Sequence, residues 1–416
     1  MESYDEVAAL VDAVALVWPR LSRVDESFEQ SVLLHLRRVE TARAAGGTGD
    51  PEAGELLSAF AAQPEARAAL MQVFDTTIKR DGSVPGIPGA VKHSRFLEIP
   101  VLYGTNRAPA KPGKADPFTG TRGAPSFGVA RVSVPDDHRM GALEKPRWWK
   151  LQFRADPEKH VALLGTAPLD QAAFTQRAST AITSAATPEA LIFVHGYNVT
   201  FTDAARRAAQ IAYDLQFDGI PMLYSWPSEG ETLSYPADAD NSLWTRPYFA
   251  DFLRLTLGGI GAQRVHLLAH SMGNRVVTQG LADLTPAESQ GLGQVVFAAP
   301  DVDAGVFTQL AAQFLRRAHR YTLYASSSDR ALQMSQTLAH YPRAGQSGPD
   351  IVVIDGLDTI DASQLDTGFM SHSYFGDRAS VLSDLFSLIR NDLEPGKRFG
   401  LTPHTSGYWT FLPTAH

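Results

Sequence analysis

The sequence places one serine, Ser271, where a nucleophile would stand. It lies in RVHLLAHSMGNRVV (residues 264–277), after a run of apolar residues and directly before a helix-compatible run. A tight turn from strand to helix lifts a serine hydroxyl clear of the backbone, and it requires small residues two positions to either side. Ala269 and Gly273 occupy these positions, with alanine where glycine is more usual. The stretch therefore predicts nucleophilic chemistry at Ser271.

Attack by a serine oxygen on a carbonyl carbon creates an oxyanion, which needs backbone N–H donors held in place in advance. The amide of Met272 should be one donor, because it directly follows the serine at a helix N-terminus. The second should come from FVHGYN (residues 193–198), where Gly196 permits close approach of the backbone and Tyr197 supplies the amide. A simple chain turn at Gly196 is the alternative interpretation.

A general base should follow the last strand of the sheet, and His372 lies there, in DTGFMSHSYF ahead of the terminal helix. It should deprotonate Ser271 and later return the proton to the leaving group. The other histidines considered are His195 and His270, which we interpret as structural, His340, which precedes the last predicted strand, and His404 and His416, which follow the terminal helix.

An acid that orients the histidine should follow a strand between the two, and Asp329 does so in LYASSSDRAL. Asp301 and Asp303, in FAAPDVDAG, are the alternatives. PDVD directly precedes a helix, however, so that one of its carboxylates can serve as an N-terminal cap. The resulting chain order of serine, aspartate and histidine is that of α/β-hydrolases, and it differs from the orders of trypsin-like and subtilisin-like proteases.

Short apolar runs alternate with helical patterns along most of the chain. This alternation predicts an α/β fold with a mostly parallel sheet that is flanked by helices on both faces. The predicted strands include 190–196, 219–226, 264–270, 294–300, 320–326 and 351–356, and the predicted helices include 202–215 and 378–393. Residues 227–244 are predicted to be irregular, and we interpret DADN at 238–241 as a solvated loop rather than a calcium site.

The beginning of the chain has a different pattern. Residues 1–90 are predicted to form an N-terminal helical extension, and residues 95–416 the catalytic domain, because a stretch rich in glycine and proline at 80–94 separates them. The apolar faces of the extension must pack against something. We expect them to cover the catalytic domain near the rim of the active site, and a homo-oligomer formed through these helices is the alternative.

Composition excludes several classes of function. The net charge of −8 disfavours nucleic acid or anionic membranes as main partners. The absence of cysteine excludes disulfides, thiolate zinc sites and a cysteine nucleophile. No apolar run approaches the roughly 18 residues of a membrane span, and the acidic start lacks the basic leader of a secretory signal. We therefore expect a cytoplasmic protein that needs no metal or cofactor.

The motifs together resemble a bacterial α/β-hydrolase family of the esterase and lipase superfamily, long catalogued as a domain of unknown function. The matching pieces are VLYGTNR, FGVARVSVPDDHRMGALEKP, FVHGYNVTF, YSWPSEG, LLAHSMGNRVV, FAAPDVD, SSSDRAL and SHSYF, within residues 98–390. The resemblance implies an α/β-hydrolase fold and places Ser271, Asp329 and His372 at the triad positions. It does not extend to residues 1–90, and it implies no single substrate.

We therefore expect a carboxylesterase, a serine hydrolase that cleaves small-molecule carboxylic esters through an acyl-enzyme. A lipase, thioesterase or amidase with the same machinery is the alternative among enzymes. An inert hydrolase fold that binds a partner is the alternative outside them. Asn198 and Trp226 are candidates for contact with substrate, and a place in the core is the equal alternative for Trp226.

Overall fold

The computed structural model describes residues 86–138, 143–144, 155–230, 234–327, 341–363, 375–398 and 400–411, and for 375–380 it describes the backbone alone. The predicted helical extension lies almost entirely outside these residues. So do Asp329 and His372, the candidate acid and base. These three assignments stay predictions.

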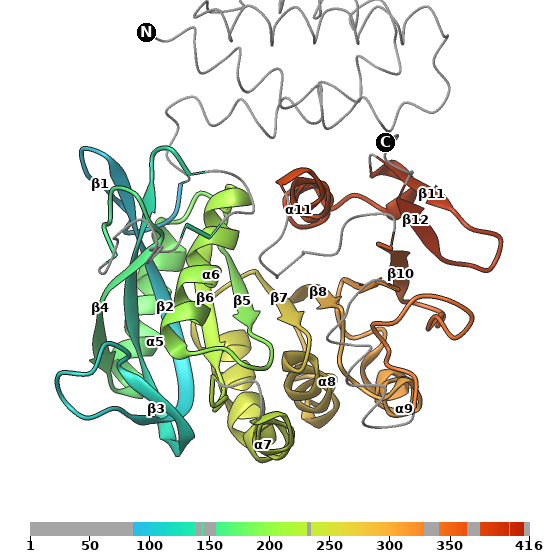
Figure 1. Ribbon diagram of the computed structural model, residues 1–416, viewed down its shortest axis with the longest axis horizontal. Coiled ribbons are helices and arrows are strands. Elements are labelled where there is room, and N and C mark those ends of the chain that lie inside the picture. Colours follow the sequence, from blue (N-terminus) through green and yellow to red (C-terminus); the bar gives the residue numbers. More distant parts are fainter. Residues whose placement is uncertain are drawn as a thin grey trace, which may run out of the picture.

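In the described part of the chain, twelve strands form one sheet in the order β11-β12-β10-β9-β8-β7-β5-β6-β2-β3-β4, with β1 paired to β2 outside this row (Figure 1). In this row, the neighbouring strands β2, β6, β5, β7, β8, β9 and β10 pair parallel, and β12 pairs parallel with β10. Strands β3, β4 and β11 pair antiparallel with their neighbours. The strands are β1 (Val91–Lys92), β2 (Phe96–Pro109), β3 (Phe118–Pro135), β4 (Ala162–Leu169), β5 (Glu189–Val194), β6 (Ile220–Ser225), β7 (Arg264–His270), β8 (Leu292–Ala298), β9 (Arg320–Ala325), β10 (Asp358–Asp361), β11 (Leu401–Pro403) and β12 (Trp409–Phe411).

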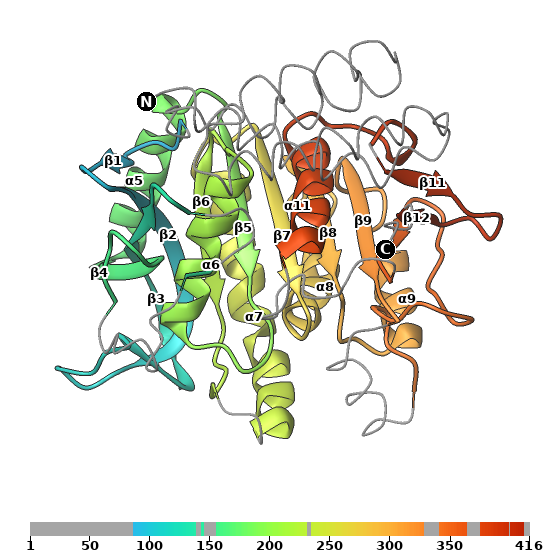
Figure 2. The same ribbon diagram turned by 45° about the horizontal axis from the view of Figure 1, so that its top comes forward.

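Helices cover both faces of this sheet, as Figures 1 and 2 show for α7, α8 and α9 on one side and α11 on the other. One hydrophobic core joins the sheet to α5, α7, α8 and α9, and a second joins it to α6 and α11. Along β5, Ile192 and Val194 belong to the first core and Leu191 and Phe193 to the second, so that the strand is apolar throughout. The helices are α5 (Gln171–Ser184), α6 (Phe201–Asp214), α7 (Tyr235–Gly259), α8 (Gly273–Asp283), α9 (Ala304–Phe314) and α11 (Phe375–Ile389), with the 3₁₀ turn η4 (Pro395–Lys397).

The connections around β5 place the candidate site. The chain leaves β5 through α6 to reach β6 on one side, and then passes through α7 to reach β7 on the other side. Because α6 and α7 lie in different cores, they leave on opposite faces, and the carboxyl ends of β5 and β7 form a topological switch point where ligands bind in such sheets. Ser271 directly follows β7, and Tyr197 follows β5.

Two local predictions are wrong. Helix α7 begins within the stretch predicted to be irregular, because Pro236 lies in its first turn, where proline costs no hydrogen bond. The acidic segment at 238–241 is therefore helical, and Asp238 is fully buried rather than solvated. The apolar run at 351–356 is not a strand, because Val352 joins the core without pairing and the next strand, β10, begins only at Asp358.

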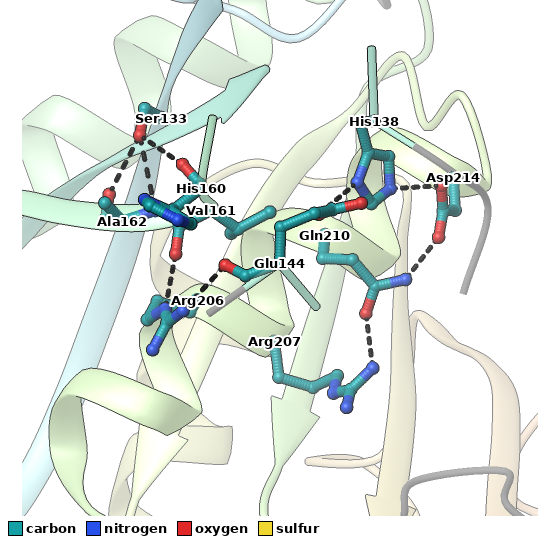
Figure 3. A network of polar contacts seen from close by, with 10 residues as sticks. All are labelled: Ser133, His138, Glu144, His160, Val161, Ala162, Arg206, Arg207, Gln210 and Asp214. Carbon is teal, nitrogen blue, oxygen red and sulfur yellow. Dashed lines mark hydrogen bonds and ion pairs between the residues drawn. The ribbon is translucent and has the colours of Figure 1, made fainter. Parts of the chain in front are cut away.

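A buried polar network joins the segment after β3 to the end of α6 (Figure 3). The imidazole of His138 lies between two carboxylates, with Nδ1 2.8 Å from Glu144 Oε2 and Nε2 3.0 Å from Asp214 Oδ1. The Gln210 side chain also donates to Asp214. Burial by itself lowers the pKa of His138, but Asp214 and Glu144 outweigh it and raise the pKa to about 9. The ring is therefore an imidazolium at neutral pH and donates to both carboxylates.

This network makes the stability of the fold depend on pH. The folded-state pKa of about 9 lies above the ordinary value of 6.5, so the stabilisation is complete below 6.5 and is lost as the pH rises through about 9. Relative to a His138→Gln variant, the wild-type protein should lose up to about 3 kcal/mol of unfolding free energy over that interval. Asp214→Asn should reduce the loss. Urea unfolding at several pH values measures it, and parallel curves for wild type and His138→Gln would contradict the assignment.

Candidate active site

The backbone turns sharply at Ser271. This residue follows the last residue of β7, its φ is +49°, and the residue is partly exposed. Its N–H donates to the Ala298 carbonyl at 3.0 Å, and its carbonyl accepts from the N–H groups of Asn274 at 3.1 Å and Asp301 at 3.2 Å. A left-handed conformation costs a residue other than glycine about 1–3 kcal/mol and is typical of functional sites. The predicted tight strand-to-helix turn is confirmed.

Small residues allow this turn to touch the loop after β5. A Cβ atom on Gly273 would lie 2.3 Å from the His195 carbonyl oxygen, so no larger residue fits there. A Cβ atom on Gly196 would lie 3.0 Å from Ser271 Cβ. The close approach predicted for Gly196 is therefore confirmed, and it brings the backbone around Tyr197 beside Ser271.

The side chain of Asn274 supports the same turn. Its Nδ2 donates to the Ser271 carbonyl at 2.9 Å and to the Ala298 carbonyl at 3.2 Å, and the residue is fully buried. It thus ties the ends of β7 and β8 together directly under Ser271. We did not single out this residue from the sequence, although a polar side chain on the buried first turn of a helix is a usable signal.

Met272 and Tyr197, whose amides are the predicted oxyanion donors, follow β7 and β5, respectively. Met272 is the N-cap residue of α8, and its N–H makes no hydrogen bond to the part of the chain that the structure describes. The ring of Tyr197 packs edge-on against Tyr235 at 5.4 Å between centroids. Asn198 is exposed with φ of +57°, and its N–H donates to Asp238 Oδ2 at 3.4 Å. A buried carboxylate on α7 therefore anchors the far end of this loop.

Trp226 supports the β5 loop from inside the core. It is fully buried, its indole N–H donates to the His195 carbonyl at 2.7 Å, and its ring stacks on the His195 imidazole at 5.2 Å. Of the two interpretations that the sequence left open, the structure places Trp226 in the core.

Both histidines beside the site are neutral at ordinary pH. Burial, followed by the nearby Arg107 guanidinium, lowers the pKa of His195 well below its ordinary value. Burial and the charge of Arg207 lower the pKa of His270 to about 3. Both ring nitrogens of His195 form hydrogen bonds to protein groups, which supports the structural interpretation of this residue. His404 lies in the turn between β11 and β12, far along the sheet from β7.

The alternative acids both have other partners. Asp303 is the N-cap of α9 and accepts from the Val306 N–H at 2.9 Å, as the capping prediction expected. Asp301 is buried and accepts from the Tyr235 hydroxyl at 2.8 Å. Its carboxylate also pairs with two cations, Arg275 and Arg343.

Arg107, at the end of β2, is a residue of the site that sequence reasoning missed. It is 1% exposed, yet every one of its N–H groups has an acceptor. The acceptors are the Ser225 hydroxyl (2.9 Å from Nε), the carbonyls of Thr119 and Ser228 (3.3 and 2.9 Å from Nη1), and His195 Nε2 and the Val199 carbonyl (3.2 and 2.7 Å from Nη2). The available signal was an arginine three positions after the apolar run VLYG, within the same strand.

The sequence model of one protein family, described as "Alpha/beta hydrolase of unknown function (DUF900)", matches residues 170–391. The chain belongs to this family. The match spans β5 to β10 and includes Ser271, so the predicted α/β-hydrolase fold and family are both confirmed. No curated protein matches the chain.

A solved structure titled "AbyA5 Wildtype" is 13% identical, with a TM-score of 0.28 over 94% of this chain and 96% of that one. Within the described part of this α/β hydrolase, no helix has the length and apolar character needed to cross a membrane.

The strain at Ser271 can be measured without reference to activity. Ser271→Gly should relieve the unfavourable φ, whereas Ser271→Ala retains it, and both variants lack the hydroxyl. The glycine variant should be more stable than the alanine variant by about 0.5–1 kcal/mol, because part of the relief is offset by the greater freedom of glycine in the unfolded chain. Chemical denaturation of both variants measures the difference. A more stable alanine variant would show that the turn carries no strain.

Proposed function

We propose that this α/β hydrolase is a serine carboxylic-ester hydrolase that works through an acyl-enzyme. The observation that carries the proposal is the partly exposed Ser271 in a left-handed turn at the carboxyl end of β7, in backbone contact with the loop after β5. Such a turn presents a hydroxyl to a ligand at the switch point of the sheet. The family membership supports hydrolysis.

In the proposed reaction His372 removes the proton of Ser271, whose oxygen attacks the ester carbonyl carbon. The carbonyl oxygen becomes an oxyanion that accepts from the amides of Met272 and Tyr197. Collapse of this intermediate breaks the bond to the alcohol oxygen, which takes the proton from His372. Water, deprotonated by the same histidine, then attacks the acyl-enzyme. The bond between the acyl carbon and the Ser271 oxygen breaks, the serine oxygen takes the proton from His372, and the acid is released. Asn198, exposed on the β5 loop, remains a candidate contact of the substrate.

Asp329 is the proposed orienting acid. It would hold the tautomer of His372 and stabilise the imidazolium that forms. The engagement of Asp303 as a helix cap and of Asp301 with Tyr235 and two arginines supports this choice, because both alternative carboxylates already have structural roles.

Replacement of the nucleophile should abolish turnover. Ser271→Ala should lower kcat for p-nitrophenyl esters by about 10³–10⁶-fold and prevent labelling by a fluorophosphonate probe. Ser179→Ala, on α5 away from the site, is the matched control and should keep both properties. A series of esters from acetate to palmitate would define acyl preference. Hydrolysis by Ser271→Ala within tenfold of wild type would place the nucleophile elsewhere.

The acid can be identified by three parallel asparagine variants. Asp329→Asn should lower kcat by up to about 10⁴-fold, by analogy with serine proteases. Asp303→Asn should leave kcat and stability close to wild type, since asparagine caps a helix about as well as aspartate. Asp301→Asn should lower the Tm, because the buried Arg343 and the partly buried Arg275 lose a charged partner. Near-normal kcat in Asp329→Asn together with a collapse in either other variant would reassign the acid.

A further inference from the structure

Among the residues that the structure describes, no carboxylate contacts the buried guanidinium of Arg107. Its five N–H groups bond to two side chains and three backbone carbonyls, and none bonds to a carboxylate. Burial lowers its pKa to about 10, against the more distant charges of Asp116 and Asp238. Burying an unpaired charge is costly. A residue of this kind requires an explanation beyond packing.

The arginine dictates where His195 carries its proton. A guanidinium can only donate, so His195 Nε2, 3.2 Å from Arg107 Nη2, must accept and carries no proton. Ser225 completes a ring of three bonds, since its hydroxyl accepts from Arg107 Nε and can donate to the same Nε2 at 3.1 Å. The proton of the neutral imidazole therefore sits on Nδ1.

The protonated nitrogen in turn fixes a peptide plane. His195 Nδ1 lies 2.8 Å from the Gly196 carbonyl oxygen, to which it donates. In a trans peptide the carbonyl and the following N–H point in opposite directions, and the described chain has no cis bond. Holding the Gly196 carbonyl toward the buried imidazole therefore turns the Tyr197 N–H away from the core, on the loop that touches Ser271.

We propose that Arg107 is a positioning residue for the reaction: it fixes the Nδ1–H tautomer of His195, which fixes the Gly196–Tyr197 peptide so that the Tyr197 N–H can bind the oxyanion. The inference rests on the proposed function for its last step. Without the Arg107 side chain, the other tautomer of His195 would place an unprotonated Nδ1 against the Gly196 carbonyl, and the two acceptors would repel each other. The peptide could then rotate and withdraw the donor.

The experiment compares Arg107→Met with Arg206→Lys in the full-length protein. Arg206 is the control, because it is also buried and also donates to backbone carbonyls, but it pairs with Asp203 and has no contact with His195. Arg107→Met should lower kcat for p-nitrophenyl butyrate about 10²-fold, the loss seen when one oxyanion donor is removed, with KM changed less than about threefold. Arg206→Lys should retain the wild-type kcat.

The tautomer is read directly by ¹⁵N NMR of histidine-labelled protein, with the His195 signals assigned through a His195→Gln variant. Wild type and Arg206→Lys should show the Nδ1–H form, and Arg107→Met should show a population of the Nε2–H form. An unchanged tautomer with kcat within threefold of wild type in folded Arg107→Met would overturn the proposal. If the wild-type protein neither hydrolyses esters nor reacts with fluorophosphonate, the proposed function fails, whereas the tautomer measurement still decides the link between Arg107 and His195.

A second pair of variants applies if Arg107→Met does not fold. The side-chain amide of asparagine occupies the place of Nδ1 and can donate to the Gly196 carbonyl, whereas the glutamine amide occupies the place of Nε2 and cannot. His195→Asn should therefore lose less than about tenfold in kcat, and His195→Gln about 10²-fold. Equal kcat in the two variants would overturn the proposed route through the peptide.

Discussion

The contact between the backbone after β5 and the backbone after β7 is the constraint on which the rest of the site depends. The space between Gly273 and the His195 carbonyl admits no Cβ atom, and Gly196 faces Ser271 with little more room. A sheet brings neighbouring parallel strands only to about 4.8 Å, so their connecting loops meet this closely only when side chains are absent. Both glycines are therefore explained by proximity rather than by a left-handed backbone, since neither has a positive φ.

Local strain is concentrated at the same edge of the sheet. Asn198, Ser271 and Ala299 follow β5, β7 and β8, and all three have a positive φ, of 57°, 49° and 45°. The turns persist because the surrounding hydrogen bonds leave the backbone no alternative. Asn274 ties two of them together, and the Ala299 N–H is held by the Tyr324 carbonyl at 2.9 Å. Backbone strain that several hydrogen bonds hold in place is typical of sites where side chains must point out of the sheet.

The features that could be predicted correctly depend on residues that lie close together in the sequence. The turn at Ser271 follows from small residues at fixed spacing beside an apolar run, and the cap at Asp303 follows from its place directly before a helix. The partnership of Arg107 with His195 could not be predicted, because the two residues are 88 positions apart and meet only through the order of strands in the sheet. The same limit explains the wrong strand prediction at 351–356, because apolar residues of this run pack in the core although the run forms no strand.

Electrostatics around Ser271 restricts which residue can serve as its base. A general base is most effective when its pKa lies near the working pH, whereas the pKa of His270 is lowered to about 3 by burial and Arg207. At neutral pH such a ring is uncharged, but it is too weakly basic to remove a serine proton. His195 is excluded more firmly, because its Nε2 accepts a hydrogen bond from Arg107 and its Nδ1–H donates to the Gly196 carbonyl. His195 is thus committed to holding the backbone and His270 is too weak a base, so in the proposed reaction the proton of Ser271 goes to a base from another segment of the chain, the role proposed for His372.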